Sequence, residues 1–118
     1  MDVSEFDPEP LNRIHGIGAD DLVGKMTEIF FRNGPERTAA AHRGAEEKDL
    51  EAIERAVHSL KSSAGNMGAR SLQTLCQEIE TLAEAGSWDG IPERLDQLDV
   101  TYKAAEAWVR NRIGELSE

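Results

Sequence analysis

The chain has 118 residues and a mass of 13.0 kDa, which is the size of one domain. Hydrophobic residues make up 39% and charged residues 31% of the sequence, a composition typical of a folded globular domain rather than a disordered chain. Its 13 basic and 23 acidic residues give a formal charge of −10, which argues against binding to nucleic acid or to anionic membranes, because both require basic surfaces.

The first residues predict a loose start followed by a short helical turn. Residues 1–10 carry two prolines among acidic residues, and we expect them to form a flexible N-terminal arm. A short helix is expected over Leu11–His15, and Gly16 and Gly18 should end it. The folded domain is therefore expected to span residues 11–118.

The next segment predicts two helices separated by a glycine–proline pair. A helix is expected over Asp20–Asn33, because its apolar residues recur at helical spacing. Gly34 is expected to end this helix and Pro35 to begin the next, over Pro35–Glu46. The apolar positions of the two segments are Leu22, Val23, Met26, Ile29 and Phe30, then Ala39, Ala41 and Ala45.

The most regular apolar pattern begins after Asp49, which is a suitable N-cap residue. Apolar residues then repeat at steps of three and four, which predicts a helix with one buried face. Asn66 and Gly68 are residues that accept the left-handed conformation at a helix end. The apolar positions are Leu50, Ile53, Val57, Leu60, Ala64 and Met67.

Two further helices complete the prediction. One is expected over Arg70–Ala85 with Gly86 as its end, and the other over Gly90–Leu116 with a near-heptad apolar repeat. No segment alternates apolar and polar residues as a strand would. The chain is therefore expected to be all-α, with four or five amphipathic helices in an antiparallel bundle.

One histidine stands out within the helix that follows Asp49. At about 100° per residue, His58 lies about 130° from the apolar face, on the solvent side. Lys61, Ser62 and Gly65 follow it by three, four and seven positions, so they share its face of the helix. A neutral imidazole nitrogen is a nucleophile near physiological pH, which makes His58 a candidate reactive residue.

The surroundings of His58 favour chemistry with a phosphoryl group. Residues 55–77 form a stretch of 23 residues without a carboxylate, although Arg55, Lys61 and Arg70 are basic. Positive charge of this kind suits a group that must receive phosphate. The tautomer of the ring would be fixed by a partner on the following helix, for which Glu80 is the first candidate and Gln77 and Gln73 are alternatives.

The stretch from His58 to Ala69 resembles the signature of histidine-containing phosphotransfer (HPt) domains of bacterial phosphorelays. This family carries the pattern His-x-Leu-Lys-Gly-Ser-Ala-Gly-Asn-x-Gly-Ala, and the chain reads HSLKSSAGNMGA. The resemblance implies an antiparallel four-helix bundle with a short extra N-terminal helix. It also implies that His58 receives phosphate from a receiver-domain aspartate and passes it to another receiver domain. Lys61 would screen the phosphoryl charge, Gly65 would leave room for the receiver, and Glu80 falls where the family orients the ring.

The resemblance also sets expectations about cofactors and partners. The chain would be a phosphocarrier without an ATP site or cofactor, and Mg²⁺ would lie in the receiver. Its partners would be receiver domains of response regulators or a hybrid histidine kinase. Ser62 stands where the family usually has glycine, so its hydroxyl would either crowd the receiver or bond the phosphoryl oxygens.

Two other functions are open to a chain of this kind. One is a docking module that binds receivers or kinases without carrying phosphate. The other is a metal site at Glu54 and His58, but two ligands are too few for a stable site, and we expect none. The start of the sequence lacks the pattern of a signal peptide, and the single Cys76 allows no internal disulfide. We therefore expect a cytoplasmic monomer without a membrane segment.

Overall fold

The computed structural model describes residues 5–116 and contains five helices over that range. Helix α1 spans Glu9–Gly16, α2 spans Asp20–Glu46 and α3 spans Leu50–Met67. Helix α4 spans Arg70–Glu84 and α5 spans Ile91–Leu116. The all-α prediction is confirmed. No described helix is both long enough and apolar enough to cross a membrane.

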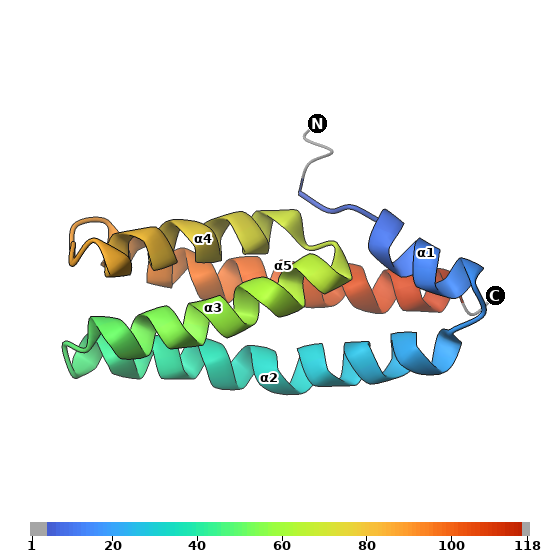
Figure 1. Cartoon of the computed structure of the whole chain (residues 1–118), viewed down its shortest axis with the longest axis horizontal. Helices are drawn as coiled ribbons and strands as arrows, with labels where there is room; N and C mark the ends of the chain where they lie inside the picture. The colour runs from blue at the N-terminus through green and yellow to red at the C-terminus, as the bar shows by residue number, and fades with distance from the viewer. Residues whose placement is uncertain (1–4, 117–118) are drawn as a thin grey trace.

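Helices α2 to α5 form an elongated antiparallel bundle, and the short helix α1 packs against one end of it (Figure 1). Helix α3 lies beside both α2 and α4, and α5 packs against α4 and α2. Consecutive helices α3 and α4 form a helical hairpin whose link is only residues 68–69. The largest fully buried side chains come from all five helices: Leu11, Phe30, Ile53, Val57, Leu60, Met67, Leu72, Cys76, Ile79, Ile91, Leu98 and Val109.

Helix α3 begins and ends as its sequence predicted. The side chain of Asp49 accepts a hydrogen bond from the backbone N–H of Ala52 at 3.1 Å, which caps the first turn. Gly68 follows the helix in the left-handed conformation, with a φ of 82°. A Cβ at Gly68 would lie 1.8 Å from the carbonyl oxygen of Asp7, so only glycine fits there. The two ends of α3 are therefore fixed. Its apolar face packs into the bundle and the opposite face lies in solvent.

Helix α2 runs without a break through Gly34 and Pro35, where the sequence predicted the end of one helix and the start of another. Pro35 lacks an N–H and normally ends or kinks a helix, so local sequence alone gave the wrong boundary. Tertiary packing explains the difference. The hydroxyl of Tyr102 in α5 donates a hydrogen bond to the carbonyl of Phe30 at 3.0 Å. Gly34 lets the ring approach, since a Cβ there would lie 2.0 Å from Tyr102 Cζ.

The segment before the bundle differs from the expected flexible arm over residues 1–10. Residues 1–4 lie outside the described residues, but Glu9 already begins helix α1. The ring of Phe6 stacks on Trp108 of α5, with ring centroids 5.0 Å apart and an interplanar angle of 9°. Residues 5–10 are therefore held against the bundle, because an aromatic anchor offsets the prolines that suggested a loose chain.

Candidate functional site

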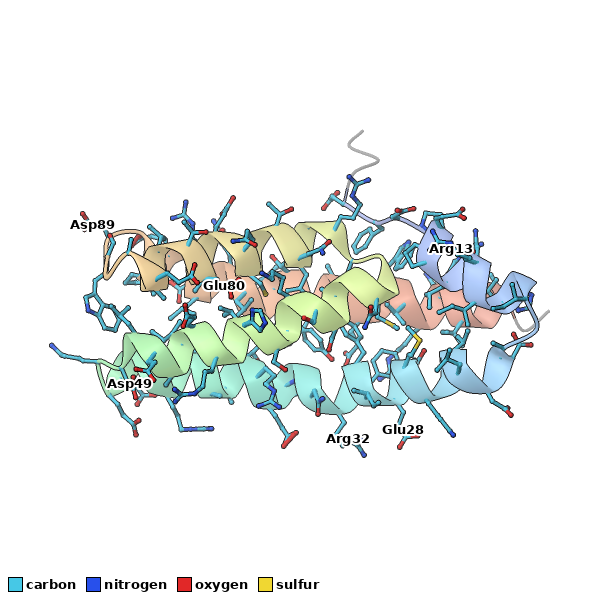
Figure 2. All side chains as sticks on the ribbon, viewed as in Figure 1. Arg13, Glu28, Arg32, Asp49, Glu80 and Asp89 are labelled. Atoms are coloured by element: carbon cyan, nitrogen blue, oxygen red, sulfur yellow. The ribbon has the colours of Figure 1, made fainter. Side chains whose placement is uncertain are left out.

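His58 lies on the outer face of α3 with 61% of its side chain exposed, as the helical spacing predicted. Its Nδ1 lies 2.6 Å from Oε2 of Glu80 on α4. The contact joins the two helices of the hairpin, and Figure 2 shows Glu80 between them. The ring is thus held by one nitrogen while the rest of it faces solvent.

Glu80 is a buried carboxylate that contacts the imidazole of His58 and the ammonium group of Lys61. Its side chain is only 9% exposed. The hydrogen bond from Lys61 lowers the pKa of Glu80 below its ordinary value of 4.5, burial opposes this shift, and the bond with His58 lowers the pKa further. The carboxylate is therefore ionised at neutral pH and can only accept hydrogen bonds. It follows that Nδ1 of neutral His58 is the protonated donor and that Nε2 carries the free lone pair.

Lys61 completes this arrangement from α3, one turn after His58. Its Nζ lies 2.5 Å from Oε1 of Glu80 and donates to Oε1 of Gln77 at 3.0 Å. The amide of Gln77 in turn donates to the hydroxyl of Thr81 at 3.0 Å. The glutamine that was an alternative partner for the imidazole ring therefore contacts the lysine instead, and Glu80 alone of the two contacts His58.

The remaining predicted site residues lie further along the same face. Ser62 is exposed, and its hydroxyl forms no hydrogen bond with a described residue. Gly65 is half-buried, and a Cβ there would lie 2.8 Å from the amide nitrogen of Gln73. Gln73, the other alternative partner for the ring, thus covers Gly65 rather than His58. Any molecule that approaches the α3 backbone at Gly65 must move this flexible side chain.

Two acidic residues beside His58 played no part in the predicted phosphate site. A shallow depression of about 360 Å³ contains the exposed ring, and its lining is Glu54, Arg55, His58, Ser59, Glu80 and Glu84. Desolvation raises the pKa of Glu54, and a hydrogen bond with Glu84 raises it further. One side of the site is therefore acidic. The position of Glu54, four residues before His58, could be recognised from the sequence. Glu84 lies on α4 and comes close to His58 only when the hairpin forms.

Metal binding and thiol chemistry find little support around this site. Within residues 5–116, no group of three or more histidine, cysteine or acidic side chains is arranged to hold a metal ion. Burial raises the pKa of the Cys76 thiol to about 12, and the nearby charge of Glu80 adds to the shift. The thiol is therefore protonated and inert, and Nε2 of His58 is the ring nitrogen left without a contact to Glu80.

Comparisons with known proteins agree on one family. The model of the family described as "Hpt domain" matches residues 25–108. Two Arabidopsis thaliana proteins are similar in sequence: histidine-containing phosphotransfer protein 2, 28% identical over 80% of the chain, and histidine-containing phosphotransfer protein 5, 24% identical over 79%. The chain covers 62% and 61% of their lengths. The crystal structure of histidine-containing phosphotransfer protein B from Pseudomonas aeruginosa PAO1 has the same fold, with a TM-score of 0.85, 21% identity, and coverage of 97% of this chain and 98% of that one.

Proposed function

The chain belongs to the Hpt domain family of phosphorelay proteins, and we propose that His58 is the residue that carries its phosphoryl group. The observation that carries this proposal is the 2.6 Å contact between Nδ1 of an exposed histidine and a buried, ionised Glu80. That contact holds the ring in the tautomer whose Nε2 is nucleophilic and aims this nitrogen at solvent. The two Arabidopsis relatives are named as histidine-containing phosphotransfer proteins, and the segment HSLKSSAGNMGA of this chain resembles the motif of such domains.

The proposed reaction is an in-line attack by Nε2 of His58 on an aspartyl phosphate of a receiver domain. A bond forms between Nε2 and phosphorus, the bond from phosphorus to the aspartyl oxygen breaks, and the electron pair returns to the aspartate. The phosphorylated ring keeps the proton on Nδ1 and becomes cationic. Glu80 balances that charge through the existing hydrogen bond, so no proton needs to leave during transfer.

Lys61 supports the reaction in two ways in this proposal. Its ammonium group keeps Glu80 ionised, and it places positive charge on the face that the phosphoryl group approaches. Ser62 is exposed one turn beyond His58, where its hydroxyl can donate to phosphoryl oxygens. Mg²⁺ would be held by acidic groups of the receiver. A monomer in the cytoplasm, with no kinase activity of its own, completes the proposal.

The test is phosphotransfer from a panel of phosphorylated receiver domains to the wild type and to His58→Gln. We expect an acid-labile, base-stable phosphate on the wild type and none on the variant. A wild type that binds receivers but stays unlabelled throughout the panel would replace this proposal with the docking module. The intact contact from His58 to Glu80 favours the carrier, because a docking module has no need of an oriented nucleophile.

A further inference from the structure

A second depression, of about 280 Å³, lies between α2 and α3 on the side of His58 that faces away from α4. Arg37 and Arg43 line it from α2 and Arg55 lines it from α3; we refer to these three residues as the arginine groove. The other lining residues are small or sit at its end: Ala40, Gly44, Glu47, Ala52 and Ala56. The small side chains at the bottom of the groove leave the guanidinium groups accessible to a partner.

The charges of the arginine groove are unusual in a chain with a formal charge of −10. Arg37 and Arg43 are exposed, and neither guanidinium group forms an ion pair or hydrogen bond with a residue in the described range. Arg55 contacts Glu51 at 3.2 Å, but both side chains are exposed, so this pair is weak. Guanidinium groups without partners are ready to bind carboxylates through paired hydrogen bonds.

The arginine groove is continuous with the site of His58. Arg55 stands one turn before His58 on α3 and lines both depressions. A partner large enough to reach Nε2 of His58 therefore has the groove beside its point of contact. On the α4 side the same partner would meet Glu54 and Glu84, so the charge changes sign across the histidine.

Resting on the proposed function, we propose that the arginine groove binds acidic side chains on the receiver domain that exchanges phosphate with His58. The occupant follows from charge complementarity, because three arginines gather beside His58 and a receiver that reaches Nε2 with acidic side chains on this side would pair with them. Nucleic acid and anionic lipid are poorer occupants, since the chain as a whole would repel a polyanion. The groove would steer and orient the receiver, while the chemistry stays with His58.

The experiment compares Arg37→Gln/Arg43→Gln with Lys25→Gln/Lys103→Gln. The control removes the same charge from two exposed lysines that also lack an ion pair with a described residue. The probe is the receiver domain that labels the wild type best. We expect the arginine variant to bind it about tenfold more weakly at low salt, mainly through slower association, and the difference to shrink as salt rises. The control should change the affinity by less than about twofold.

A second readout separates docking from chemistry. Labelling of His58 by phosphoramidate, a donor too small to need a docking surface, should be the same in both variants and the wild type. Receiver binding that is equal in both variants overturns the role of the arginine groove and leaves the phosphocarrier proposal standing. A wild type that no receiver labels or binds overturns both. Wild-type binding to duplex DNA or to phosphatidylserine vesicles that the arginine variant loses would overturn the choice of a receiver as occupant.

Discussion

Replacement of Glu80 by alanine tests whether this carboxylate makes His58 reactive. The substitution removes the acceptor that lies 2.6 Å from Nδ1 of His58 and leaves Oε1 of Gln77 as the one acceptor for Nζ of Lys61 among residues 5–116. Both neutral tautomers of the imidazole then become accessible, and the ring can rotate. We expect the variant to fold but to react more slowly at Nε2.

The size of the effect follows from the contact that is lost. A hydrogen bond to a charged group contributes about 1.5–3 kcal/mol, equivalent to about tenfold to about 150-fold in rate if the bond is fully used in the transition state. His58 is 61% exposed, so water competes for Nδ1 after the substitution. We therefore expect the lower part of that range, about tenfold to thirtyfold. Glu80→Gln should lose less, because its single amide oxygen can still accept from the ring.

The assay is the rate of His58 labelling by phosphoramidate, which avoids any effect on docking. Nitrogen-15 NMR of the ring gives an independent readout, and we expect the Nδ1–H tautomer in the wild type and a mixture in Glu80→Ala. Glu78→Ala is the matched control. It removes an exposed carboxylate from the same helix, but the Glu78 carboxylate contacts Arg94 and not His58. A Glu80→Ala variant with wild-type tautomer and a rate within about twofold of the wild type would refute the role of Glu80 in orienting the ring.

Three further predictions concern stability and access. The pKa of Glu80 in the folded state lies below its ordinary value of 4.5. The ionised carboxylate should therefore contribute fully to the free energy of unfolding above pH 4.5, and this contribution should be lost as the pH falls through the folded-state pKa. Urea unfolding of the wild type and of Glu80→Gln at several pH values measures the contribution. Gly34→Ala should destabilise the fold by about 1–3 kcal/mol in the same assay, because its Cβ overlaps the ring of Tyr102. Cys76 should resist thiol alkylation in the native protein and react once urea unfolds the bundle.

Each of these predictions has a result that contradicts it. A stability difference between wild type and Glu80→Gln that grows as pH falls below 4.5 would contradict the lowered pKa. A Gly34→Ala variant as stable as the wild type would show that Tyr102 packs elsewhere, and Ala39→Gly on the exposed face of α2 is the control for helix propensity. Alkylation of Cys76 at the rate of a free thiol would contradict its burial.

The elements that local sequence determines were predictable. The cap at Asp49, the left-handed Gly68 and the apolar face between them define α3, so the exposure of His58 followed from residue spacing alone. The choice of Glu80 was a first preference among three side chains on the next helix. The hairpin decided between them, since only the structure shows which of the three reaches Nδ1.

The features that depend on distant contacts were not predictable. Nothing near Gly34 and Pro35 indicates that Tyr102, far along the chain, packs against them, so the predicted break in α2 was wrong. The stacking of Phe6 on Trp108 is equally distant in sequence. The arginine groove needs α2 and α3 side by side before its three members become neighbours. The spacing of residues in the sequence predicts which side chains share a face of one helix. It does not predict which residues of two different segments come into contact.

The hairpin of α3 and α4 supplies every residue of the His58 contact network, whereas two of the three groove arginines come from α2. In the proposed function, the reaction therefore depends on α3 and α4 alone, whereas recognition of the receiver also depends on α2. If the arginine groove recognises the receiver as proposed, substitutions on the outer face of α2 after a gene duplication would redirect one copy to a new receiver while the imidazole, its carboxylate and its lysine stay unchanged. Under that proposal, parallel signalling pathways would be kept separate without a second phosphotransfer reaction.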